Sequence, residues 1–131
     1  MILEHKETAA VVRPMLETMA ANLRRLTDLL LDEEYDEQFL RPSRAAFETT
    51  WTLLVAADAS ISPGLPLASP APVGDGGILV QWQRGERTVF LAVPADPSQG
   101  YLYLRGPEFR QTVRELADSR LISALQWLIK E

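Results

Sequence analysis

The sequence predicts one α+β domain in which an N-terminal helical hairpin, a three-stranded antiparallel β-meander and a C-terminal helix follow one another. Both ends of the chain carry apolar residues at three- and four-residue spacing, and between them lie short β-rich runs separated by turn residues. The chain has 131 residues, of which 47% are hydrophobic and 24% charged. A chain of this size and composition can bury a core, so we expect residues 1–131 to form a single domain.

The helical hairpin is predicted over residues 13–60. In its first helix, apolar residues such as Leu23 and Leu26 recur at helical spacing on one side. A second helix is expected to open near Ser43, a residue type that caps helix N-termini, and to end at Ser60. The two helices would then lie side by side through a short acidic connection.

The rest of the chain is predicted as a linker, a sheet and a helix. Residues 61–77 hold four prolines and four glycines and are expected to form an ordered linker without regular structure. Residues 78–105 are expected to form the β-meander, with Gly85 in the turn of its first hairpin. Apolar spacing after Pro107 predicts a helix over residues 107–130.

Strand alternation divides the predicted sheet into two faces. One face is apolar and is expected to pack under the helices. The other mixes aromatic and polar residues, which is typical of an interface. An equally open alternative is that a helix of the same chain covers this second face. The candidate interface residues are Leu79, Gln81, Gln83, Phe90, Ala92, Tyr101 and Tyr103.

The acidic residues are concentrated in the first third of the chain. Of 18 acidic residues, nine lie within residues 1–40, together with only four of the 13 basic residues. The net charge of −5 argues against direct binding of nucleic acid and favours a basic protein partner. Candidate contacts to such a partner are Asp32, Glu33, Glu34, Asp36 and Glu37.

No residue pattern indicates catalysis, a cofactor or a metal. The chain has no cysteine and one histidine, His5, and none of its serines lies in a nucleophile elbow. The glycines around Asp75 precede a strand and are interpreted as a turn rather than a phosphate-binding loop. Arg110 and Arg114 are interpreted as exposed residues one helical turn apart, with an anion site as the lesser alternative. We therefore expect a protein that is not an enzyme.

One segment resembles a known group of proteins. Pro70-Ala71-Pro72, then Asp75-Gly76-Gly77-Ile78 and Trp82, are similar to a module found in small, largely uncharacterised bacterial proteins, some of which accompany toxins. The similarity covers residues 70–104. It implies an antitoxin-like, partner-neutralising role in a bacterial protein and identifies no catalytic residues.

The leading functional hypothesis is a non-enzymatic protein-interaction domain. Two alternatives stay open: a small-molecule-binding or enzymatic domain with a pocket between helices and sheet, lined by residues such as Tyr101 and Tyr103, and a self-associating assembly subunit. A homodimer is compatible with the first and the last of these. No apolar run reaches the length of a membrane span and no signal-peptide pattern opens the chain, so a cytoplasmic protein is expected.

Overall fold

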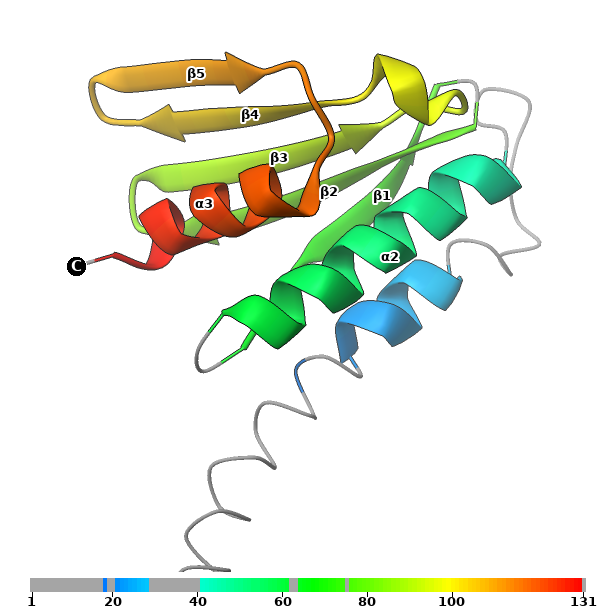
Figure 1. The fold of residues 1–131 in the computed structure, drawn as a ribbon, viewed down its shortest axis with the longest axis horizontal. Coiled ribbons are helices and arrows are strands. Elements are labelled where there is room, and N and C mark those ends of the chain that lie inside the picture. Colours follow the sequence, from blue (N-terminus) through cyan, green and yellow to red (C-terminus); the bar gives the residue numbers. More distant parts are fainter. Residues whose placement is uncertain (1–17, 19–20, 29–40, 62–63, 75, 131) are drawn as a thin grey trace, which may run out of the picture.

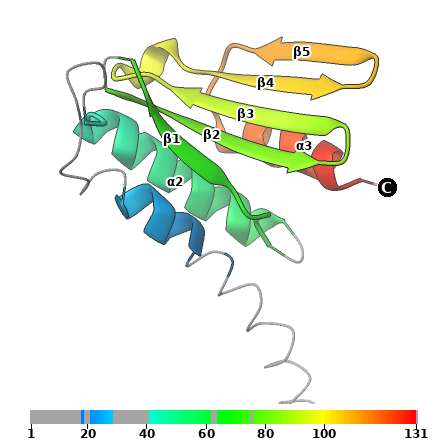
Figure 2. The same cartoon turned by 180° about the vertical axis from the view of Figure 1, so that it is seen from behind.

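The computed structural model describes residues 18, 21–28, 41–61, 64–74 and 76–130. Residues 21–28 are helical and precede the numbered elements. Figures 1 and 2 show two layers, a sheet and a set of helices that all lie on one side of it. The elements are, in chain order, α2 (Arg44–Ser60), β1 (Ser69–Val73), β2 (Gly77–Arg84), β3 (Arg87–Val93), the 3-10 turn η1 (Pro97–Gln99), β4 (Tyr101–Gly106), β5 (Phe109–Val113) and α3 (Asp118–Ile129).

The sheet is antiparallel with the order β1-β2-β3-β4-β5. The predicted three-stranded meander is therefore wrong in strand number, because the sheet has five strands. The three predicted strands correspond to β2, β3 and β4, and Gly85, with φ of 60°, lies in the turn between β2 and β3 as expected. The two strands that were not predicted lie at the two edges.

Strand β1 lies inside the segment that was predicted as an irregular linker, residues 61–77. It pairs with β2 although it contains Pro70 and Pro72, which pair with Val80 and Ile78. Proline lacks a backbone N–H but is tolerated at a sheet edge, where alternate residues need no partner on the outer side. The prolines therefore restrict this segment to an edge position without excluding a strand.

Strand β5 replaces the start of the predicted helix 107–130. Pro107 and Glu108 form a two-residue turn between the paired residues Gly106 and Phe109. Phe109 and Val113 are four residues apart, a spacing that places them on the same side of either a helix or a strand. The helical periodicity is real only from Asp118, where α3 begins.

Helix α2 has the bounds that its sequence predicts. The Oγ of Ser43 accepts a hydrogen bond from the amide of Ala46 at 3.0 Å and donates one to the carbonyl of Ala95 at 2.9 Å. The amide of Ser43 also donates to the carbonyl of Gly76 at 2.8 Å. This cap joins the start of α2 to one end of the sheet. Of the first predicted helix the structure describes only residue 18 and residues 21–28, so the full hairpin over 13–60 stays a prediction.

The core lies between the helices and one face of the sheet. Leu26, Leu54, Leu91 and Leu125 come from the helices and β3, and each is at most 1% exposed. The inward-facing strand residues that alternation predicts are all buried, which confirms the assignment of the two faces. These are Ile78, Val80, Trp82, Val89, Leu91, Val93, Leu102 and Leu104.

Candidate functional site

The sheet has a second face that points away from the core, called the open face below. Figure 2 views the molecule from this side, and no element that the structure describes lies over it. The register of the five strands assigns alternate residues to it. They are Ser69, Ala71, Val73, Leu79, Gln81, Gln83, Thr88, Phe90, Ala92, Tyr101, Tyr103, Arg105, Arg110, Thr112 and Arg114.

The seven candidate interface residues named from the sequence all belong to the open face. Leu79, Ala92 and Tyr101 form one row across β2, β3 and β4. Gln81, Phe90 and Tyr103 form the next row, and Gln83 lies opposite Thr88 beside them. Tyr101 is 36% exposed. The structure therefore brings these residues together on one surface, where all of them except Ala92, which is 7% exposed, are at least partly accessible.

The middle of the open face is hollowed. A concavity of about 590 Å³ extends across four strands, with Leu79 at one side and Thr112 at the other. Its walls are aromatic and cationic, since the remaining lining residues are Phe90, Tyr101, Tyr103, Arg105 and Arg114. This is large enough to accept a side chain or a short segment of another molecule.

Aromatic rings and guanidinium groups are in contact around the hollow. The rings of Phe90 and Tyr103 have centroids 6.0 Å apart with an interplanar angle of 37°. The guanidinium of Arg105 lies 5.9 Å from the centroid of Phe90, and that of Arg114 lies 5.9 Å from the centroid of Tyr101. These cation–π contacts hold both arginines against the surface.

The arginines of this surface do not follow from the local sequence pattern. Arg110 and Arg114 were assigned to a helix face, but Arg110 lies in β5 and Arg114 directly follows it, so both project on the open face. Recognising the turn at Pro107 would have revealed their alternation with Gln111 and Val113.

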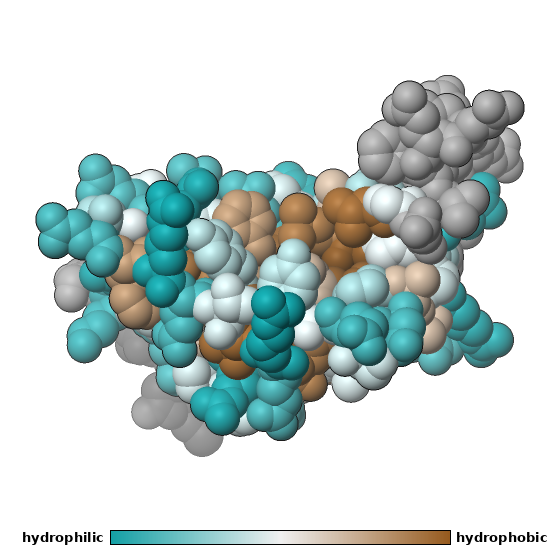
Figure 3. Space-filling model, turned by 90° about the horizontal axis from the view of Figure 1, so that it is seen from above, coloured by the Kyte–Doolittle hydropathy of each residue, from teal (hydrophilic) through white to brown (hydrophobic). Residues whose placement is uncertain are grey.

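Figure 3 views the molecule from above, the side on which β5 lies in Figure 1, and shows hydrophilic side chains standing around apolar ones.

The acidic candidates lie outside the described residues. They are Asp32, Glu33, Glu34, Asp36 and Glu37. The histidine, His5, also lies outside the described residues. The structure therefore does not bear on their prediction as contacts to a basic partner.

The described residues offer little chemistry beyond hydrogen bonding and charge. They contain no group of three or more histidine, aspartate or glutamate residues that could hold a metal ion. Away from the open face, on α2, Glu48 accepts a hydrogen bond from Arg44 at 2.8 Å, and this bond raises the pKa of the arginine. Nothing on the open face is arranged as a nucleophile with a general base.

The layer between the helices and the sheet is filled by the core. The buried apolar cluster continues from Leu26 through Leu53 and Trp82 to Leu128. Tyr101 and Tyr103, which were expected to line a pocket in this layer, lie instead on the opposite side of the sheet. Any pocket that they form is therefore part of the open face.

Neither a protein-family model nor a curated protein nor a solved structure matches this chain. Among the described residues, no helix has both the length and the apolar character needed to cross a membrane.

Proposed function

We propose that this chain is a non-catalytic protein-interaction domain that binds a partner through the open face. The observation that carries the proposal is an aromatic face, hollowed in the middle, that lies opposite a fully packed core. Aromatic residues and arginines are enriched in protein interfaces, where their large rigid groups supply most of the binding energy. Binding of a partner would cover Leu79, Phe90 and Tyr103 and would need no change in the fold.

An antitoxin-like, partner-neutralising role is the specific form of this proposal. It is supported by the resemblance of residues 70–104 to proteins that accompany toxins. The residues of that resemblance, Pro70 to Trp82, build β1, the β1–β2 turn and β2, which carry one side of the open face. A domain of this kind would act by occupying a surface of its partner.

Site-specific photo-crosslinking in cells tests the proposal. A photoreactive phenylalanine analogue is placed at Tyr103 on the open face and, as a matched control, at Val55, which is 42% exposed on α2. We expect a covalent adduct with one protein at Tyr103 and not at Val55. The adduct should disappear when Phe90 is changed to Gln, with the circular dichroism spectrum unchanged.

Other outcomes decide between the alternatives. Adducts of equal yield at both positions, or none at Tyr103, would contradict an interaction role for the open face. An adduct of twice the chain mass would instead support the self-associating subunit.

A small-molecule site is the second candidate, favoured by the hollow itself. Arg105, Thr112 and Arg114 line a volume of about 590 Å³, which is the size of a small-ligand site. An anionic metabolite would fit this lining. A rise in melting temperature over a panel of carboxylates and phosphates, lost in Arg114→Gln, would favour this candidate over protein binding.

A further inference from the structure

The open face has a charge opposite to that of the whole chain. The chain has 18 acidic and 13 basic residues, but the fifteen open-face residues include three arginines and no aspartate or glutamate. The three cations, Arg105, Arg110 and Arg114, lie together on the β4–β5 side of the face. The face is therefore a local positive patch on an acidic protein, and such a patch attracts anionic groups.

Two of these arginines oppose each other directly. Arg105 pairs in register with Arg110 across β4 and β5. Like charges at directly opposite positions of a sheet are unfavourable. The ion pairs among the described residues are Arg44 with Glu48 and Arg120 with Glu115, so neither Arg105 nor Arg110 is neutralised within this part of the chain. A bound carboxylate would remove the repulsion.

The edge of the sheet next to these arginines is open to a further strand. β5 is the last strand in the sheet order, and its first four residues are exposed. An edge strand offers unpaired N–H and C=O groups to an extended partner segment. The opposite edge, β1, is less suitable because Pro70 and Pro72 interrupt its donors.

The register of β5 defines what such a segment must carry. Arg110, Thr112 and Arg114 alternate on the open face, so an added strand would place every second residue beside them. Carboxylates four residues apart would reach the two arginines. The residue between them would lie beside Thr112, which is paired with Tyr103 at the hollow, so an aromatic or apolar side chain fits there.

Two other occupants match these observations less well. A second copy docking face to face supplies no carboxylate, because none of the fifteen open-face residues is acidic. Nucleic acid would use free aromatic rings as stacking platforms, whereas Phe90 and Tyr101 are each in contact with a guanidinium group.

We infer that the open face binds an extended acidic segment of a protein partner, added along β5, with carboxylates on Arg110 and Arg114 and an apolar side chain over the hollow. The inference rests on the proposed function and specifies the partner's chemistry. It also differs from the basic partner that the overall charge predicts, because this surface carries three arginines and no acidic residue.

Fluorescence anisotropy with a labelled peptide tests the inference on the full chain. The probe is the nonapeptide Gly-Thr-Glu-Thr-Phe-Thr-Glu-Thr-Gly, and its control has glutamine in place of both glutamates. We expect saturable binding of the glutamate peptide and at least tenfold weaker binding of the control. Arg110→Gln and Arg114→Gln should each weaken binding roughly tenfold, the effect of losing one charge-assisted hydrogen bond. Arg24→Gln, at an exposed position on the helical segment 21–28, should bind like the wild type.

The competing outcomes are distinct. Equal affinity for both peptides, or unchanged affinity in the Arg110 and Arg114 variants, would overturn the inference. Tighter binding of a fifteen-nucleotide oligothymidine, or displacement of the peptide by an equal concentration of citrate, would assign the arginines to nucleic acid or to a small anion. If Tyr103 crosslinks to a partner whose contact segment is not acidic, the inference fails while the proposed interaction role stands.

Discussion

The side-chain oxygen of Asn22 accepts a hydrogen bond from the amide of Ala68 at 2.7 Å, although the two residues are 46 positions apart. The Nδ2 of Asn22 donates to the carbonyl of Pro66 at 3.1 Å, and the indole of Trp82 donates to the same carbonyl at 3.1 Å. Asn22 is only 1% exposed. Together with Arg25, which donates to the carbonyl of Ala68 at 2.9 Å, Asn22 joins the helical segment 21–28 to the chain that leads into β1.

Replacing Asn22 by alanine should destabilise the fold. The change leaves the buried amide of Ala68 without an acceptor, which costs about 1–3 kcal/mol of unfolding free energy. Urea denaturation followed by circular dichroism measures the loss. Arg24→Ala, at an exposed position of the same helical segment, is the control and should stay within about 0.5 kcal/mol of the wild type. Equal losses in both variants would show that Asn22 has no special role.

The cap of α2 gives a second prediction. Ser43→Ala removes the acceptor for the amide of Ala46 and the donor to the carbonyl of Ala95. Loss of an N-cap costs about 1 kcal/mol, which for a domain of this size lowers Tm by about 3–6 °C in a thermal melt. Thr52→Ala, on the exposed side of α2, should change Tm little or raise it slightly, because alanine favours helix. An unchanged Tm in Ser43→Ala would contradict the role of the cap.

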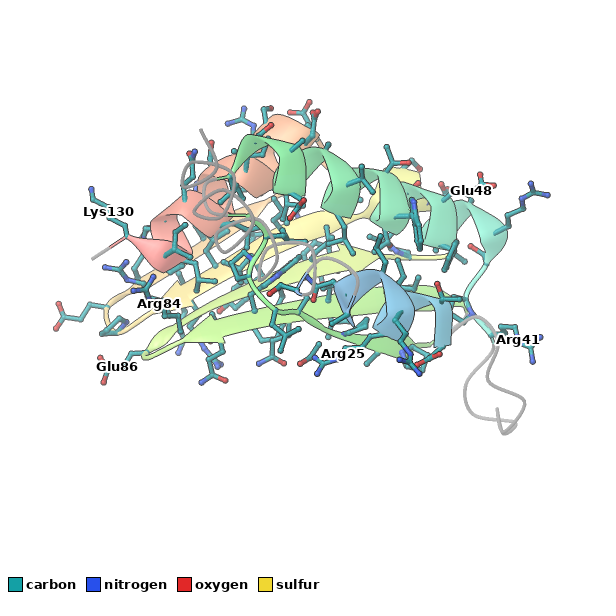
Figure 4. All side chains as sticks on the ribbon, turned by 90° about the horizontal axis from the view of Figure 1, so that it is seen from below. Arg25, Arg41, Glu48, Arg84, Glu86 and Lys130 are labelled. Carbon is teal, nitrogen blue, oxygen red and sulfur yellow. The ribbon has the colours of Figure 1, made fainter. Side chains whose placement is uncertain are left out.

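The end of α3 is held by the β2–β3 hairpin. Figure 4 shows Arg84, Glu86 and Lys130 at the same end of the molecule. Arg87 donates to the carbonyls of Trp127 at 2.8 Å and Lys130 at 2.6 Å, and its guanidinium lies 5.4 Å from the centroid of the Trp127 ring. A cation at a helix C-terminus donates hydrogen bonds to the free carbonyls and interacts favourably with the negative end of the helix dipole.

Arg87→Ala should therefore release the last turn of α3. We expect a loss of about 1–2 kcal/mol in unfolding free energy and a red shift in tryptophan emission as Trp127 becomes more exposed. The unfolding free energy of Arg87→Lys should lie between those of the wild type and Arg87→Ala, because lysine keeps the charge but cannot reproduce the planar guanidinium group. Glu86→Gln, in the turn directly before Arg87, is the control. An emission spectrum identical to that of the wild type in Arg87→Ala would refute the contact with Trp127.

The central part of the fold could be predicted because its signals are local. Ser43 capped a helix, Gly85 closed a hairpin, and strict alternation from Ile78 assigned the two faces of the sheet. The edge strands could not be predicted in the same way. β1 contains two prolines, and β5 has apolar residues at a spacing shared by helices and strands, so only pairing with a neighbour decides their structure.

The candidate site was half predictable for the same reason. Residues such as Phe90 and Tyr103 followed from alternation within strands that the sequence already indicated. Arg110 and Arg114 did not, because they join the open face only through the pairing of β5 with β4. The charge of the surface, and with it the chemistry of the partner that we infer, depends on long-range strand pairing. The net charge of the chain does not show which charged residues share a surface.

The opposition of Arg105 and Arg110 leads to the last prediction. Arg110→Glu converts a like-charge pair into an opposite-charge pair at the same cross-strand position. Such pairs differ by about 0.2–1 kcal/mol, so the variant should be more stable than the wild type at low ionic strength. The gain should shrink in 1 M NaCl, where charges are screened beyond about 3 Å. Chemical denaturation at the two salt concentrations measures both effects.

The same variant separates stability from binding. Arg24→Glu changes the net charge equally at an exposed position away from the sheet and controls for overall charge. We expect Arg110→Glu to be more stable than the wild type. We also expect it not to bind the glutamate peptide, because the new carboxylate repels the carboxylates of the peptide. Like-charged residues that cost stability but are needed for binding indicate a functional surface. A variant that was less stable than the wild type at low salt would show that Arg110 has a structural role in the β4–β5 hairpin. A variant that still bound the peptide would show that Arg110 does not bind its carboxylates.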